Sequence, residues 1–403
     1  MKKLNFPVLI GLESIVSDEL EALGYATTAI TKSNASVSLE LEDNIEDLSV
    51  AIAKTNIYLR TAERVELELL EFQAKDFDEL FVRVQEFAWE NWIPKDAAFN
   101  IKGFNRKSNL YADSSIQSTI KKAIVVRLQS AWGLNEESKL TEDSDILELN
   151  LRYSLLNNKM NISLDTTGVG LHKRGYRLES NEAPIKETLA AGILDISMYS
   201  ATSGELLYDP CCGSGTFLIE AAMKAANIQP GSYRSFDYEK WEFLDQEITG
   251  KVRQEAIANE TAESFDQVLF AGSDIDEESI RISKENAQRA GVANLIDFSV
   301  QNLESLNVDE LLRKYEQEKI LFVANPPYGD RMSDERKVQK LNRALGKLAF
   351  YPKSKFTKPN VRLSVITSAD FERHTSHKAD KRRKLYNGMK KTDLYHYFRA
   401  KYV

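Results

Sequence analysis

Residues 206–217 read LLYDPCCGSGTF, and this stretch decides the class of fold that the sequence predicts. An apolar run reaches an acid at Asp209, glycines follow at positions 213 and 215, and the apolar spacing of a helix begins directly after them. Glycine lets a backbone approach a ligand closely, and free N–H groups at a helix start attract carboxylates and other anions. The stretch is neither GxGxxG nor a phosphate-binding loop ending in GK[ST]. It predicts a ligand-binding turn between a strand and a helix; a tight turn without a ligand is the alternative.

Strands and helices alternate on both sides of this turn, apart from a long connection at 228–266. Alternation of this kind predicts an α/β fold, a doubly wound Rossmann-like parallel sheet with ligands at the carboxyl ends of its strands. The predicted strands are 205–209, 267–273, 295–300, 319–324, 361–367 and 393–402, and the predicted helices are 183–197, 215–227, 277–290, 307–318 and 334–349.

The first 160 residues follow a different pattern, in which strands and helices mix as in an α+β domain. One helix is marked by Leu12, Val16, Leu20 and Leu23 at helical spacing. The predicted strands are 3–10, 35–41, 63–71, one that begins at 99, 146–152 and 159–166, and the predicted helices are 11–23, 46–54, 76–91 and 113–130.

Charge is distributed unevenly along the 403 residues, whose formal net charge is −8. Residues 1–160 carry 18 Lys and Arg against 26 Asp and Glu, whereas residues 161–403 balance at 35 against 35. Two stretches are basic: residues 98–130 hold six basic residues and one acid, and residues 371–391 hold eight and two. Each is either a solvated face or a nucleic-acid surface, and both interleave aromatic residues as nucleic-acid surfaces do. The candidate nucleic-acid contacts are Lys102, Arg106, Lys107, Lys121, Lys122, Arg382, Arg383 and Lys384.

Several classes of protein and site are disfavoured. No apolar run reaches the roughly 18 residues of a membrane span, and the N-terminus lacks a signal-peptide pattern, so we expect a cytoplasmic protein without membrane contact. The two cysteines, Cys211 and Cys212, are neighbours, which argues against a disulfide between them. With four histidines besides, the usual ligand set of a zinc site is missing, and we expect no metal.

Two further acids and an amide follow the next strands. Asp274 ends a predicted strand, where folds of this kind place an acid that binds ribose hydroxyls. Asp276 fits better as the cap of the following helix. Asn302 follows the third strand and is either an adenine contact or a turn residue.

The stretch ANPPYGD, residues 324–330, follows an apolar strand and stops it with two prolines. Pro326 and Pro327 fix the chain, so the Asn325 side chain and nearby carbonyls become fixed hydrogen-bond acceptors, and Tyr328 adds a flat aromatic face. Two acceptors beside an aromatic ring suit a planar group that bears an exocyclic NH2. A strand terminator without a ligand is the alternative for the tetrapeptide taken alone.

Together these motifs resemble the class I S-adenosylmethionine-dependent methyltransferases that modify nucleobase amines or amides. The segments 165–177 (DTTGVGLHKRGYR), 183–194, 230–241 and 384–397 are similar to the bacterial ribosomal-RNA guanine-N2 methyltransferases that carry a THUMP domain. The resemblance covers nearly the whole chain. Some of those relatives carry a second methyltransferase domain, and only the guanine-N2 half is implied for this sequence.

The resemblance implies three parts: a ferredoxin-like part at 1–45, a THUMP RNA-binding domain at 46–160, and a methyltransferase domain at 161–403 with a linker at 165–182. It implies S-adenosylmethionine as cofactor, S-adenosylhomocysteine as product, and 23S ribosomal RNA or a ribosomal assembly intermediate as partner. The target amine is expected at Asn325, Pro326, Pro327 and Tyr328. The expected cofactor residues are Asp209, Cys211, Gly213, Gly215, Thr216, Phe217, Asp274, Ile275 and Asn302; many relatives have an acid at the position of Asn302.

Three other functions stay open at this point. A DNA adenine-N6 methyltransferase shares the Asn-Pro-Pro-Tyr chemistry but has no evident use for a THUMP-like half. A protein-glutamine methyltransferase also uses the tetrad but needs no basic tail. A non-catalytic RNA-binding or ribosome assembly factor is disfavoured because Asp209, Asp274 and Asn325 are intact.

Overall fold

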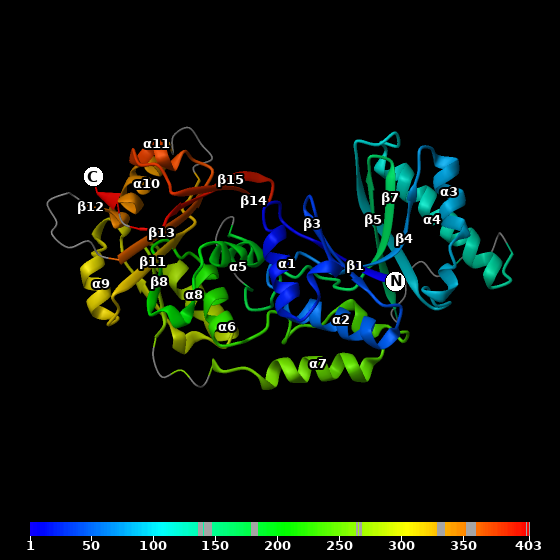
Figure 1. Cartoon of the computed structure of the whole chain (residues 1–403), viewed down its shortest axis with the longest axis horizontal. Coiled ribbons are helices and arrows are strands. Elements are labelled where there is room, and N and C mark those ends of the chain that lie inside the picture. Colours follow the sequence, from blue (N-terminus) through cyan, green and yellow to red (C-terminus); the bar gives the residue numbers. More distant parts are fainter. Residues whose placement is uncertain are drawn as a thin grey trace.

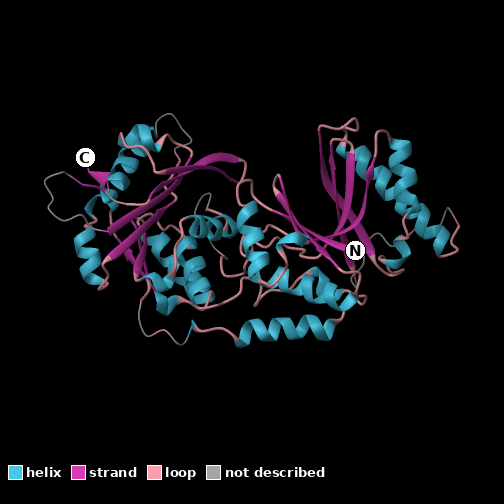
Figure 2. Cartoon of the chain, in the orientation of Figure 1, coloured by secondary structure: helices cyan, strands magenta, loops and turns pink. Residues whose placement is uncertain are grey.

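The structure is a computed structural model of the 403-residue chain, and it describes residues 1–135, 140, 147–178, 184–262, 265, 268–328, 335–351, 360–399 and 401–402. Two seven-stranded sheets lie toward opposite ends of an elongated molecule (Figure 1). Helices cover both sheets (Figure 2). Across the described residues, no helix has the length and apolar character needed to cross a membrane.

The second half of the chain builds the sheet that the turn at 206–217 predicts. Its strand order is β10-β9-β8-β11-β13-β15-β14, and the first five strands are parallel. The strands are β8 (Glu205–Asp209), β9 (Phe270–Asp274), β10 (Ile296–Val300), β11 (Lys319–Ala324), β13 (Asn360–Thr367), β14 (Lys381–Asn387) and β15 (Lys390–Tyr397). A short parallel pair, β12 (Phe350–Tyr351) and β16 (Lys401–Tyr402), stands apart from this sheet.

Helices lie on both faces of this sheet, which makes it doubly wound. Along β8, Leu207 packs into the core shared with one helix layer, whereas Leu206 and Tyr208 pack with the other. The first layer is α5 (Glu187–Ile196), α6 (Thr216–Ala225) and α8 (Glu277–Arg289), and the second is α9 (Val308–Lys314) and α10 (Glu335–Ala349). The short helix α11 (Phe371–Thr375) precedes β14.

The predicted α/β class is confirmed, but two expectations for this half were wrong. The last two strands are antiparallel, because β14 and β15 form a hairpin and β15 pairs antiparallel with β13. The connection at 228–266 contains a helix, α7 (Gln246–Ala258), whose N-terminus is capped by Asp245. Its apolar pattern is weak because only Thr249, Val252 and Ala256 are buried.

The first half of the chain forms the other sheet, with strand order β2-β3-β1-β4-β7-β6-β5. The sheet is continuous across β4, so the division of this half at residue 45 stays a prediction. Its strands are β1 (Lys2–Pro7), β2 (Ile30–Ser33), β3 (Ser36–Leu41), β4 (Glu66–Gln73), β5 (Ala98–Arg106), β6 (Glu148–Leu156) and β7 (Lys159–Asp165), and its helices are α1 (Glu13–Ala22), α2 (Ile45–Tyr58), α3 (Phe77–Glu86) and α4 (Asp113–Ala131).

The helix predicted at 76–91 ends earlier, at Glu86. Phe87 is extended, and a separate 3-10 turn holds Trp89, which is fully buried. The indole of Trp89 donates to the carbonyl of Val84 at 2.7 Å, and its ring packs edge-on against Phe87. The helix ends here because the chain turns to bury the Trp89 ring and to give its indole N–H a hydrogen-bond acceptor. The apolar periodicity of the sequence alone does not reveal this.

The two halves share one hydrophobic core, which includes β1, α2 and the α5–α6 layer. Arg60 donates to the carbonyl of Ile228 at 2.6 Å, and a Cβ at Gly231 would lie 2.5 Å from Ile57 Cα, so the backbones touch there. The connection that carries α7 therefore runs directly under the first half, where α7 lies beneath α2 (Figure 1).

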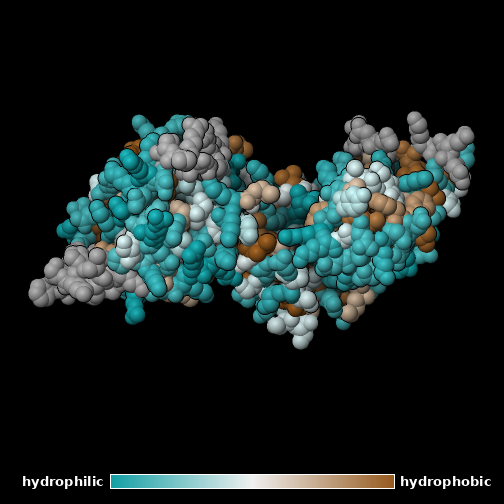
Figure 3. Space-filling model, turned by 90° about the horizontal axis from the view of Figure 1, so that it is seen from above, coloured by the Kyte–Doolittle hydropathy of each residue, from teal (hydrophilic) through white to brown (hydrophobic). Residues whose placement is uncertain are grey.

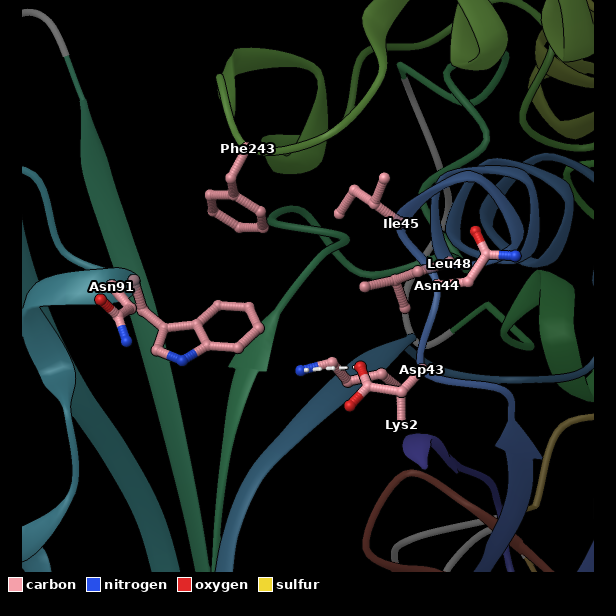
Figure 4. Close-up of a pocket in the computed structure, with 8 residues that line it drawn as sticks. Lys2, Asp43, Asn44, Ile45, Leu48, Asn91 and Phe243 are labelled. Atoms are coloured by element: carbon pink, nitrogen blue, oxygen red, sulfur yellow. Dashed lines mark ion pairs between the residues drawn. The ribbon is translucent and has the colours of Figure 1, made fainter.

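A cavity of about 470 Å³ lies where the first half meets this connection (Figure 4). Phe243 comes from the connection and faces Trp92, whose ring also lies 4.9 Å from Lys2 Nζ. None of the predicted site residues lines it, and the lining residues are Lys2, Asp43, Asn44, Ile45, Leu48, Asn91, Trp92 and Phe243.

Candidate functional site

The predicted site residues meet at the carboxyl edge of the sheet in the second half of the chain. In register, Asp209 of β8 pairs with Gly272 of β9, and Asp274 of β9 pairs with Val300 of β10. On the other side, β11 runs parallel to β8 and ends at Ala324, directly before Asn325. Because parallel strands end at the same edge, the turn after β8, Asp274 and the Asn-Pro-Pro-Tyr stretch are neighbours.

The turn after β8 is fixed by backbone hydrogen bonds. Cys211 N–H donates to Asp209 Oδ1 at 3.0 Å, and Cys212 N–H donates to the carbonyl of Ser273 at 3.0 Å. Gly215 caps α6 with φ of +83°, a left-handed conformation that favours glycine. A Cβ at Gly213 would meet no atom within 4 Å, so the turn faces open space at that residue.

Asp209 is an unusual acid because it is only 2% exposed. Burial raises the pKa of Asp209 to about 8; the Cys211 N–H works against this, and the charge of Asp274 adds to it. Its carboxyl is therefore largely protonated at neutral pH, and a cationic group beside it would favour ionisation. Burial also raises the pKa of Cys211 and Cys212, which are free thiols.

Asp274 has an oriented carboxylate. Oδ2 accepts from Gly213 N–H at 3.0 Å and Oδ1 accepts from Asp276 N–H at 3.1 Å. A carboxylate has about four lone-pair sites, so each oxygen keeps capacity for another donor. Ile275 beside it is 70% exposed, an apolar side chain without cover at the edge of the sheet.

Asn302 acts locally as a cap. Its Oδ1 accepts from Glu304 N–H at 2.9 Å and begins the 3-10 turn Leu303–Ser305. The side-chain carbonyl of Asn302 is thus used in the turn, which is one of the two predicted roles of this residue. The other role, an adenine contact through its side-chain NH2, stays a prediction. Asp276 caps α8 as expected, because its Oδ2 accepts from Ser279 N–H at 3.1 Å.

Thr216 and Phe217 lie at the start of α6, with side chains that are 3% and 1% exposed. Phe217 packs in the core, so any cofactor contact of this residue is through its backbone. Thr216 Oγ1 accepts from Arg177 at 3.1 Å, and the same guanidinium pairs with Glu187 at 2.7 Å. Arg177 was not predicted as part of the site, although it lies in the quoted segment 165–177.

The Asn-Pro-Pro-Tyr stretch leaves β11 as predicted, with Pro326 buried and Pro327 exposed. The hydroxyl of Tyr328 donates to Asn325 Oδ1 at 2.5 Å. This contact was not predicted, because the sequence indicates an acceptor and an aromatic face but not that they bond each other. Gly329 and Asp330, the end of the quoted stretch, lie outside the described residues.

The β14–β15 hairpin adds two residues that were missed. Asn387 Nδ2 donates to the Tyr328 hydroxyl at 3.2 Å, and Lys390 Nζ lies 4.9 Å from the centre of the Tyr328 ring. The Asn-Gly pair at 387–388 was the available signal, since Asn-Gly between two strands predicts a hairpin turn. The pair also lies in the basic stretch 371–391 and in the segment 384–397, and no hairpin is predicted there.

The basic residues predicted to bind RNA lie on three surfaces. Lys102 and Arg106 are exposed on the face of β5 that is not covered by helices, and Lys107 follows in the turn. Lys121 and Lys122 are exposed on α4, which covers the other face of the same sheet.

The third surface is β14, and two of the three residues predicted there make contacts within the chain. Arg382 pairs with Asp393 at 2.7 Å, and Arg383 donates to Ser14 Oγ at 3.4 Å. Lys384 is exposed. Among the described residues, no three His, Cys, Asp or Glu side chains form a group that could hold a metal ion.

Comparisons with known proteins match all three parts. The models of an RlmL ferredoxin-like domain, a THUMP domain and an RMKL-like methyltransferase domain match residues 3–66, 74–164 and 174–396. YpsC of Bacillus subtilis, a proposed RNA methyltransferase, is 36% identical over 391 residues, which are 96% of this chain and 94% of that protein.

Other relatives are longer than this chain. Ribosomal RNA large subunit methyltransferase K/L of Psychromonas ingrahamii is 34% identical over 328 residues; these cover 81% of this chain but 41% of that protein, so the chain spans less than half of it. The crystal structure of SMU.472, a proposed methyltransferase in complex with S-adenosylhomocysteine, has a TM-score of 0.83 at 34% identity and covers 98% of both chains.

Proposed function

The chain belongs to the RMKL-like methyltransferase family, and from this premise we propose that it methylates guanine N2 of large-subunit (23S) ribosomal RNA. Its cofactor is S-adenosylmethionine, and S-adenosylhomocysteine is the product. The observation that carries the proposal is the register that places Asn325, an amide acceptor, beside the turn that begins at Asp209.

Three observations indicate that the site fits the cofactor. The turn faces open space at Gly213, the oriented Asp274 carboxylate keeps lone pairs for ribose hydroxyls, and Ile275 offers an exposed apolar face for adenine. We assign the cationic amino group to Asp209 and backbone contacts to the segment from Cys211 to Phe217. When bound, the cofactor supplies a methyl group on a positively charged sulfur.

Asn325 and the carbonyl of Pro326 would hold the target amine. The lone pair of an aromatic amine is delocalised into its ring, so the amine is a weak nucleophile. Accepting both hydrogens at fixed oxygens orients the nitrogen and favours its pyramidal form; such positioning contributes as much as about 7–11 kcal/mol in favourable cases. The target base leaves its stack to reach the pocket, and Tyr328 replaces part of the lost stacking.

RNA as the substrate is supported by the first half of the chain, which matches the ferredoxin-like and THUMP models. The helix-free face of β4–β7 is turned toward the β14–β15 hairpin across the upper side of the molecule (Figure 1). In the view from above, hydrophilic side chains cover much of the coloured surface, with apolar side chains scattered among them (Figure 3). We propose that the basic residues on β5, α4 and β14 bind the RNA backbone. A cytoplasmic location stays a prediction.

The test is transfer of labelled methyl from S-adenosylmethionine to ribosomal RNA purified from cells that lack the gene, followed by nucleoside analysis. Label in N2-methylguanosine is the expected result. Label in N6-methyladenosine, or transfer to DNA alone, would favour an adenine methyltransferase, and no transfer to any nucleic acid would favour a binding factor. Asn325→Ala should lower kcat about 100-fold or more, as misplacement of a reacting group does, with little change in cofactor affinity.

A further inference from the structure

The tip of the β14–β15 hairpin contacts the amine-binding tetrad. Asn387 is the last residue of β14 and Lys390 the first of β15, and the two are paired in the hairpin. Asn387 Nδ2 donates to the Tyr328 hydroxyl at 3.2 Å, and Lys390 Nζ lies 4.9 Å from the Tyr328 ring centre. The Tyr328 hydroxyl thus bonds both the hairpin, through Asn387, and Asn325.

The contact between Tyr328 and Asn325 weakens the acceptor that the target amine would use. Asn325 Oδ1 accepts the Tyr328 hydroxyl at 2.5 Å, and this is the oxygen that would accept a hydrogen of the target amine. Burial raises the pKa of Tyr328 to about 12, so the phenol keeps its proton at neutral pH. An amide oxygen has two lone pairs, so the hydroxyl and an amine hydrogen would share Oδ1, and this oxygen accepts the amine more strongly once the hydroxyl has another acceptor.

Asn387 is placed to supply that acceptor. Its amide carries a carbonyl oxygen as well as the NH2 that already reaches the hydroxyl, so rotation of the amide would present Oδ1 to Tyr328. Resting on the proposed function, we propose that Asn387 is a positioning residue for methyl transfer: it accepts the Tyr328 hydroxyl when the target amine takes Asn325 Oδ1. Lys390 steadies the ring from the same hairpin.

The hairpin is itself fixed from the first half of the chain. Leu385 is fully buried, and a Cβ at Gly11 would lie 3.0 Å from Leu385 Cδ2 and 3.0 Å from the carbonyl of Lys384. Arg383 donates to Ser14 Oγ at 3.4 Å. These contacts tie the hairpin that carries Asn387 to the first half of the chain.

A double-mutant cycle tests the proposal. Asn387→Ala is made in the wild-type chain and in the Tyr328→Phe chain, and kcat and KM for ribosomal RNA are measured for all four proteins. Asn387→Ala should lower kcat about 10-fold in the wild-type chain and change it less than 2-fold in the Tyr328→Phe chain, where no hydroxyl needs an acceptor. Asn387→Asp, which keeps an acceptor, should retain most of kcat. Met389→Ala, a fully exposed change in the same turn, is the control.

Equal losses of kcat in the two chains would overturn the proposal and assign Asn387 a structural role only. Urea unfolding of the same four proteins provides a readout apart from activity: coupling in stability without coupling in kcat also overturns it. Absence of methyl transfer by the wild-type protein would instead refute the proposed function, and this inference with it.

Discussion

The main-chain N–H of Gly213 donates to Oδ2 of Asp274 at 3.0 Å, which ties the turn after β8 to the end of β9. The carboxylate is therefore oriented before any ligand binds. We expect Asp274→Ala to weaken S-adenosylhomocysteine binding at least about 10-fold, because it removes a charged acceptor, worth about 1.5–3 kcal/mol, and frees the turn. Isothermal titration calorimetry measures the dissociation constant.

The matched control is Asp276→Ala, the same change two residues later. Asp276 caps α8 through Ser279, so this variant should lose some stability but keep its affinity for S-adenosylhomocysteine. Equal affinities of the two variants would contradict the assignment of Asp274.

The second prediction concerns pH and Asp209, whose pKa burial raises from 3.8 to about 8. Between these values the folded protein holds a proton that the unfolded chain has released, so the free energy of unfolding falls as pH rises through this window and levels off above it. From pH 6 to pH 8.5 we expect Asp209 to remove on the order of 2 kcal/mol of stability.

Urea unfolding of the wild type and of Asp209→Asn at the two pH values isolates this effect, because other titrating groups are shared. The asparagine variant should lose less stability across the window. Parallel pH profiles of the two proteins would show that Asp209 titrates outside it.

A third prediction concerns the buried pair of Arg174 and Glu220, both in the second half of the chain, whose side chains are 1% and 0% exposed. Arg174 also donates to the carbonyl of Arg60, which holds the first half. Glu220→Gln leaves the buried guanidinium without its charge partner, and loss of one partner costs about 3–5 kcal/mol. Glu247→Gln, in the exposed pair with Lys251, should cause no measurable change in urea unfolding. Similar losses in both variants would refute this.

Local pattern predicted most of the sheet that carries the site. The ends of β8, β9 and β11 follow from apolar runs that stop at Asp209, Asp274 and Asn325, because a buried parallel strand leaves a continuous apolar segment. The role of Asn387 did not follow, because its contact with Tyr328 joins residues 59 positions apart. Helix α7 was missed because its stability comes from packing on α2 and not from a strong apolar face.

The last prediction separates two surfaces that the sequence presented as one. Lys102 and Arg106 lie on the helix-free face of β5, and Lys121 and Lys122 lie on α4 behind the same sheet. One double variant carries both Lys102→Glu and Arg106→Glu, and the other carries both Lys121→Glu and Lys122→Glu. We compare these two double variants. Each changes the net charge equally, so the pairs are controls for each other.

Both double variants should raise the dissociation constant for ribosomal RNA and leave cofactor affinity unchanged. We expect the β5 pair to cause the larger loss, because its face is turned toward the β14–β15 hairpin (Figure 1), whose Asn387 contacts Tyr328. Each lost phosphate contact should lower the salt dependence of RNA binding by about 0.7–0.9 in the log–log slope. A larger loss from the α4 pair would place the RNA on the outer, helical side, and unchanged binding in both would remove these residues from the interface.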